Sequence, residues 1–318
     1  MKSISLILPA IFLGLLAPTL SEYQIYLLSL TLLWSILALG MGLILGYAGE
    51  VNFGQAGFVA ISAYVSTLLR TKLGFSFWEA APIALATTVG CAAIVGSITM
   101  RLRGPFFVLV MLAFGEIVRL ILSNWQSMTN GPLGLRQIAP PEPIFGMNFQ
   151  SKLSFFYLIL AVLTLVIIAM IRLVNSRMGR VFVAAREDEL LAEFLGVPLM
   201  KSKVIALSTG AFVGALGGLL LAPFLTVLSP SQFSMFAAVD MVVMVIVGGA
   251  GTIVGPIMGA IFLVYVPELL SFSHEIRPIL MGTLLILATM FIPSGLAGFF
   301  TPYIDRFISR WKTKKASL

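Results

Sequence analysis

Long apolar runs separated by short polar stretches dominate this chain. They predict helices near residues 4–20, 23–46, 56–71, 79–100, 105–123, 153–173 and 203–225, an interrupted apolar segment at 239–266, and a final helix near 278–293. Runs of about 20 apolar residues are long enough to cross a bilayer as helices, and a membrane barrel would need a period-two alternation that is absent here. The pattern predicts an all-α membrane protein: one polytopic helix bundle of about 8–10 transmembrane segments, forming a single domain over residues 1–318.

The composition supports this class. The 318 residues are 59% hydrophobic and 10% charged, with a mean hydropathy of +1.05, whereas soluble domains carry about 25% charged residues. The single cysteine, Cys91, cannot form an intrachain disulfide. The apolar run after Lys2 resembles a signal peptide, but no small-residue cleavage site closes it and a second span follows at once. We therefore expect an uncleaved first helix.

The basic residues indicate the orientation of the bundle. If the spans alternate, 14 lysines and arginines lie on one side and five on the other, with Arg119 inside a span. The richer side is expected to be cytoplasmic and to hold both termini. With both termini on the cytoplasmic side, the number of membrane crossings must be even. Segment 239–266 must therefore enter the membrane from the outer side and return to it, as a hairpin of two short helices that turns at 248–251. The basic tail, about 301–318, is expected to touch anionic lipid.

Two glycine-rich stretches, 46–57 and 248–259, interrupt the apolar runs, one in each half of the chain. Irregular backbone at membrane depth is tolerated only where it packs on protein or lines a cavity, and transporters built from repeats have such broken segments beside the substrate. We predict that these re-entrant stretches line a translocation path; close helix packing through small residues is the alternative. The predicted path residues are Gly49, Glu50, Asn52, Gln55, Gly57, Gly248, Gly249 and Gly251.

Few ionisable residues lie inside the predicted spans. Glu116 and Arg119 are three residues apart, so they share a helix face and can form an ion pair. Intramembrane charges are functional candidates, but a neutralising pair can also be structural, and both interpretations stay open. His274, the single histidine, has no partner for a metal site, and no metal is predicted. No catalytic or phosphate-binding motif occurs, so this chain is not expected to be an enzyme.

A charged segment at residues 182–204 separates two of the predicted membrane helices. Good helix-forming residues extend to Leu195, and Gly196 stands where a left-handed C-terminal cap is expected, with Pro198 soon after. We predict a short helix parallel to the membrane, within a cytoplasmic loop of about 174–203, that docks in a groove of a cytoplasmic partner. An ordinary solvated loop is the alternative.

Four stretches together resemble the permease subunits of branched-chain amino-acid ABC transporters of the LivM type, over nearly the whole chain. They are residues 46–58, 113–119 followed by 124–125 and 129–135, 185–196, and 247–256. The third resembles the coupling loop of ABC importers, whose consensus is Glu-Ala-Ala, three residues, Gly. Leu190, Leu191 and Ala192 stand at the Glu-Ala-Ala positions, and Gly196 matches the glycine. Glu50 and Gln55 replace residues that are commonly glutamine and histidine in the first stretch.

The resemblance implies the fold of an ABC importer permease in the bacterial inner membrane, translocating branched-chain (hydrophobic) amino acids delivered by a periplasmic binding protein. It implies a second, LivH-like permease subunit and cytoplasmic ATP-binding cassette subunits, which would hold ATP and Mg²⁺, while this chain binds no cofactor and no nucleic acid. Urea, amides or aromatic acids are alternative substrates, and an ion-coupled secondary transporter is a further alternative. The residues expected to couple to the ATPase are Arg186, Glu187, Asp188, Glu189, Ala192, Glu193 and Gly196.

Overall fold

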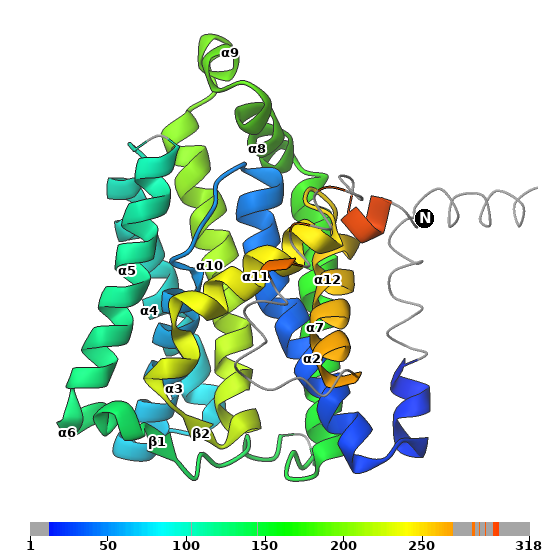
Figure 1. The fold of residues 1–318 in the computed structure, drawn as a ribbon. Coiled ribbons are helices and arrows are strands. Elements are labelled where there is room, and N and C mark those ends of the chain that lie inside the picture. The colour runs from blue at the N-terminus through cyan, green and yellow to red at the C-terminus, as the bar shows by residue number, and fades with distance from the viewer. Residues whose placement is uncertain are drawn as a thin grey trace, which may run out of the picture.

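The computed structural model describes residues 13–102, 104–144, 146–269 and positions 282, 283, 286, 290 and 295–298. Long helices run side by side between two ends of a bundle (Figure 1), one carrying helices α8 and α9 and the other the two-stranded antiparallel sheet β1–β2. The elements are η1 Ala17–Thr19, α2 Glu22–Gly42, η2 Leu43–Tyr47, α3 Gln55–Leu73, α4 Phe77–Thr99, α5 Pro105–Asn124, α6 Gln126–Thr129, η3 Gly131–Leu133, β1 Leu135–Arg136, α7 Lys152–Val174, α8 Arg177–Glu187, α9 Glu189–Phe194, α10 Leu199–Leu225, β2 Val227–Leu228, η4 Pro230–Phe233, α11 Met235–Gly248 and α12 Val254–Leu269.

The predicted helices agree closely with the observed ones. Five described helices are long and apolar enough to cross a membrane: α2 with its extension η2, α4, α5, α7 and α10. The prediction for 56–71 corresponds to α3, and segment 239–266 is broken, as predicted, into the hairpin of α11 and α12. The all-α polytopic class is therefore confirmed. The helix predicted at 4–20 lies mostly outside the described residues, as does the one at 278–293, and the basic tail lies wholly outside them.

Helix α10 occupies the centre of the bundle, where it packs against α2, α3 and α4. The most apolar stretch of α10 is 67% buried, whereas the corresponding stretches of α4 and α5 are only 22% and 28% buried, which places those two helices at the periphery. Small residues allow the central packing. A Cβ added at Gly218 would lie 2.4 Å from the carbonyl oxygen of Val59 on α3.

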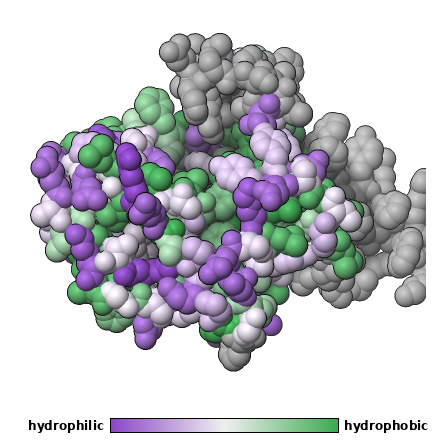
Figure 2. All heavy atoms as spheres, turned by 90° about the horizontal axis from the view of Figure 1, so that it is seen from below, coloured by the Kyte–Doolittle hydropathy of each residue, from purple (hydrophilic) through white to green (hydrophobic). Residues whose placement is uncertain are grey.

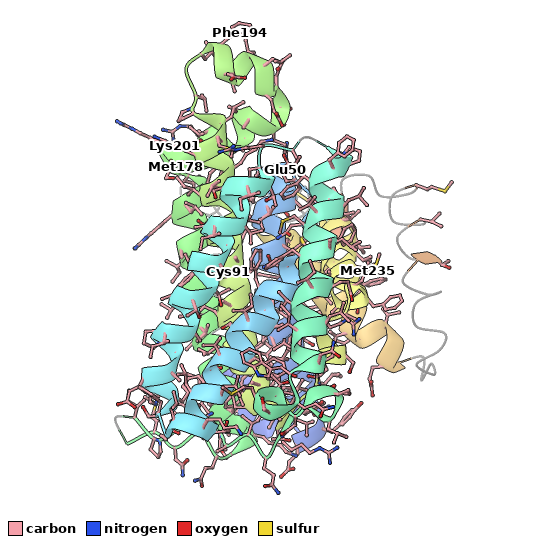
Figure 3. All side chains as sticks on the ribbon, turned by 90° about the vertical axis from the view of Figure 1, so that its left-hand side faces the viewer. Glu50, Cys91, Met178, Phe194, Lys201 and Met235 are labelled. Atoms are coloured by element: carbon pink, nitrogen blue, oxygen red, sulfur yellow. The ribbon has the colours of Figure 1, made fainter. Side chains whose placement is uncertain are left out.

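The α11–α12 hairpin is held together by backbone contact. A Cβ at Gly259 of α12 would lie 1.8 Å from the carbonyl oxygen of Met244 on α11, and one at Gly248 would lie 1.9 Å from the carbonyl oxygen of Gly255. After α10 ends, the chain passes through β2 and η4 and turns back into the bundle. Met235, at the start of α11, therefore lies about midway between the two ends of the bundle (Figure 3). Helix α11 therefore begins at membrane depth.

The β1–β2 end carries many hydrophilic side chains (Figure 2) and is tied together by Arg70 of α3. Its guanidinium donates hydrogen bonds to the carbonyl oxygens of Ala139 and Pro140 and to the Glu142 carboxylate. Burial of Glu142 favours its protonated form, but hydrogen bonds from the backbone N–H of Phe77 and from Arg70 outweigh this effect. The pKa of Glu142 is therefore held below its usual value.

Candidate functional site

The charged segment forms two short helices that project beyond the bundle (Figure 1). The prediction of one helix running to Leu195 was wrong, because Asp188 has extended backbone and ends α8. Its side chain accepts a hydrogen bond from the backbone N–H of Leu191 at 3.0 Å and so caps the start of α9. The predicted end is confirmed, since Gly196 has a left-handed φ of +81°.

Helix α9 exposes apolar side chains at the tip of this projection. Phe194, labelled in Figure 3, is 87% exposed and Leu195 is 76% exposed, while Leu190 and Leu191 are each more than half exposed. Ala192 alone on this helix is buried, on the side that faces the bundle. Exposed apolar groups gathered in this way are typical of sites that interact with another protein or with a membrane.

A buried lysine joins α9 to the first glycine-rich stretch. Nζ of Lys203, in the second turn of α10, lies 2.6 Å from Oε1 of Glu50 and 2.5 Å from Oε1 of Glu189. The side chains of Lys203, Glu50 and Glu189 are 6%, 11% and 37% exposed. Sequence reasoning gave Lys203 no role; its position at the start of an apolar helix was the signal that it needed an anionic partner.

Arg186 of α8 lies between the two glycine-rich stretches. Its Nη1 donates a 2.5 Å hydrogen bond to the carbonyl oxygen of Gly46, and its Nη2 pairs with Glu187. A Cβ at Gly49 would lie 2.6 Å from Cγ of Arg186, and one at Gly46 would lie 2.5 Å from the backbone nitrogen of Gly251. The structure thus brings both stretches together at the α8–α9 end, where Arg186 of α8 contacts them directly.

Asn52 and Gln55 are fully buried and hydrogen-bonded. Nδ2 of Asn52 donates to Oε1 of Gln55 at 3.1 Å, and Nε2 of Gln55 donates to the carbonyl oxygen of Gly210 on α10 at 3.0 Å. Gly57 packs against Gly115 of α5. In this conformation these residues join helices, and their role in a path stays a prediction.

A cavity of about 1000 Å³ lies elsewhere, between α2, α3, α10, η4, α11 and α12. Its lining is mainly aliphatic and aromatic, including Trp34, with Asp240, Glu268 and Gln232 among the polar groups. None of the predicted path residues lines it, although Ala56 beside Gln55 does. Sequence reasoning missed this cavity because its walls come from elements far apart in the chain.

Glu116 and Arg119 form the predicted ion pair, with 2.7 Å between Oε2 and Nε and each side chain 29% exposed. The other carboxylate oxygen of Glu116 accepts a 3.1 Å hydrogen bond from the backbone N–H of Met235. A negative charge at a helix start is favourable, so Glu116 anchors the beginning of α11.

The described side chains of this site make ionic and hydrogen-bonded contacts. Within the described ranges, no cluster of three or more histidine, cysteine or acidic side chains could hold a metal ion. Two sets of contacts reach the glycine-rich stretches: one runs from α9 through Lys203 to Glu50, and the other runs from α8 through Arg186 to Gly46.

Comparison with known proteins shows the family of this chain. A family model described as "Branched-chain amino acid transport system / permease component" matches residues 23–291. The high-affinity branched-chain amino acid transport system permease protein LivM of Escherichia coli (strain K12) is 32% identical, over 84% of this chain and 68% of that protein. The corresponding LivH protein of the same strain is 25% identical, over 83% and 91%.

A probable branched-chain amino acid transport permease protein LivM of Methanocaldococcus jannaschii is 26% identical, over 86% of this chain and 94% of that protein. The family match covers α2 from its second residue and every later described helix and strand to α12, and it includes all four stretches that carry the resemblance. The chain belongs to the family of permease components of branched-chain amino acid ABC transport systems, as a transport subunit and not an enzyme.

Proposed function

We propose that this chain is the permease subunit of an ATP-driven importer that moves branched-chain amino acids across the bacterial inner membrane. The observation that carries the proposal is the family match over residues 23–291, together with relatives whose names specify branched-chain amino acids. In this proposal the α8–α9 end and both termini are cytoplasmic, and a periplasmic binding protein delivers substrate at the β1–β2 end.

Helix α9 is the proposed docking element for an ATP-binding cassette subunit. The exposed side chains of Leu191, Phe194 and Leu195 would enter a groove on that subunit, and Glu189 and Glu193 would lie at its edge. An apolar centre with a polar rim is the usual anatomy of such contacts. ATP and Mg²⁺ would be bound by the ATPase partner, with no cofactor on this chain.

Two cations would transmit movement of this element into the membrane. Glu189 on α9 shares Lys203 with Glu50, and Arg186 on α8 holds the carbonyl of Gly46 beside Gly251. We propose that the two glycine-rich stretches form the inner gate. The predicted path residues would then border the path once the stretches separate, and would pack together in the closed arrangement described here.

The proposal includes a second permease subunit of the LivH type. Its support is that both LivM and LivH proteins, each named as a permease of the same kind of system, are similar to this chain. Urea, amides or aromatic acids remain alternative substrates, because the described cavity lining is mainly apolar and does not distinguish among them.

The test is affinity purification of the tagged protein in mild detergent, followed by reconstitution with its co-purified subunits and binding protein. We expect an ATP-binding cassette subunit, a second permease, and ATP-dependent uptake of labelled leucine that excess urea, an amide or an aromatic acid does not inhibit. Transport by the chain alone, without ATP, would overturn the proposal in favour of a secondary carrier. Uptake inhibited by one of the competitors would instead correct the substrate.

A further inference from the structure

The outer side of α5 differs from the outer sides of the other long helices. Among the described helices of 18 or more residues, α5 alone carries charged side chains in its middle. Around them its surface is apolar: Leu109 is 61% exposed, Ile117 is 54% exposed and Leu120 is 48% exposed. Helix α7 also exposes apolar side chains, such as Leu165 at 66%, but its charged residues lie only at its ends.

The charges of α5 lie close to mid-depth. Glu116 is the twelfth residue of a 20-residue helix, so at 1.5 Å per residue it is about 2 Å from the helix centre. It contacts Met235, which lies at a similar height (Figure 3). Glu116 and Arg119 are each 29% exposed, and charged side chains at this depth face protein or water because contact with lipid is costly.

The backbone beside this pair gives an independent indication. The chain from residue 226 to 234 turns back into the bundle, and α11 begins there with Met235 43% exposed and Phe236 67% exposed. A helix start at membrane depth leaves backbone N–H groups without intrahelical partners. Such backbone is found only where it is covered by protein or lines a water-filled cavity.

We propose that this surface, the α5–α11 face (Leu109, Glu116, Leu120, Met235 and Phe236), is where the LivH-type permease subunit docks. The inference rests on the proposed function, which includes a second permease subunit. Docking covers the apolar side chains of α5 and removes the ion pair and the start of α11 from lipid. The outer side of α7, which has no charge at depth, stays in lipid.

The test is photo-crosslinking in the complete transporter within native membranes. A photoreactive amino acid replaces Leu109 or Leu120 on α5, and Leu165 on α7 is the matched control with similar exposure and chemistry. We expect the two α5 positions to give adducts with the second permease, identified by mass spectrometry, and the control to give at least tenfold less. Adducts from α5 with lipid alone or with a second copy of this chain would overturn the proposal.

A second variant tests the same surface without crosslinking. Leu120→Trp should reduce recovery of the second permease several-fold, because an interface packed to protein density does not accommodate the larger ring, whereas Leu165→Trp should leave recovery unchanged. Equal recovery with both variants would overturn the proposal. If no second permease co-purifies with the unmodified chain, the proposed function itself fails. If a second permease co-purifies but crosslinks only through Leu165, the proposed function stands and only the assignment of the α5–α11 face as its docking surface is wrong.

Discussion

Replacing Lys203 with methionine should strongly destabilise the protein. The Lys203 side chain is 6% exposed, and its Nζ lies 2.6 Å from the carboxylate of Glu50, which is 11% exposed. Lys203→Met preserves an unbranched side chain of similar length but removes the positive charge, so the buried carboxylate of Glu50 loses its cation. Removal of one member of a buried ion pair costs about 3–5 kcal/mol.

Two further variants identify which contact carries this cost. Glu189 is 37% exposed, so Glu189→Gln should lower the free energy of unfolding by no more than about 1 kcal/mol. The double variant Lys203→Met with Glu50→Gln removes both buried charges. It should recover most of the stability lost in the single variant, because replacing a whole buried pair is often close to neutral.

The assay is thermal unfolding of the purified complex in detergent, combined with ATP hydrolysis and substrate uptake after reconstitution. The reasoning would be refuted if Lys203→Met unfolded at the wild-type temperature, or if the double variant were no more stable than the single one. Glu189→Gln, with near-normal stability, should also transport fewer substrate molecules per ATP hydrolysed. An unchanged ratio would show that the contact of Glu189 with Lys203 has no part in coupling.

Three other predictions follow from local geometry. Gly196→Val should lower the free energy of unfolding by about 1–2 kcal/mol. The cost comes from the left-handed backbone alone, because no atom lies within 4 Å of an added Cβ. The variant should also lower binding-protein-stimulated ATP hydrolysis, and equal activity of Gly196→Val and Gly196→Asn would contradict this. Gly259→Ala should lower the free energy of unfolding by about 1–3 kcal/mol or more. Gly90→Ala has open space around the added Cβ and should leave the free energy of unfolding unchanged or raise it. Thermal unfolding compares the two variants. Glu142→Gln should lower stability at pH 7 by less than about 1 kcal/mol, because the carboxylate is 44% exposed. That difference should shrink as the pH falls through the lowered pKa of the Glu142 carboxyl, where the wild-type group becomes protonated; a difference that persists once the carboxyl is protonated would refute the ionic contribution.

The helices were predictable because their signal is local. Runs of about 20 apolar residues give α4, α5 and α7 directly, and the parity of basic residues led to the α11–α12 hairpin without knowledge of any contact. The left-handed backbone of Gly196 was predictable for the same reason, since a glycine followed by a proline ends a helix. Local patterns of length, capping and charge therefore account for most of the described fold.

The candidate site depended on information that local patterns do not contain. Glu50 and Lys203 are separated by 153 residues, and no spacing along the chain indicates their contact. The break at Asp188 was missed because a good helix-forming run hid a residue that prefers to cap. The chain's return to mid-depth before Met235 was also missed, since the apolar run there reads like the start of an ordinary span.

The backbone contact between α11 and α12 has a mechanical consequence. Because no side chains separate the helices near Gly259, neither can slide along the other, and the hairpin moves as a rigid lever. One end of this lever touches Arg186 through Gly251, and the other is Met235, held by Glu116. Helix α11 has 14 residues and so spans about 20 Å. We expect a small tilt imposed at Arg186 to be carried along α11 to the α5–α11 face.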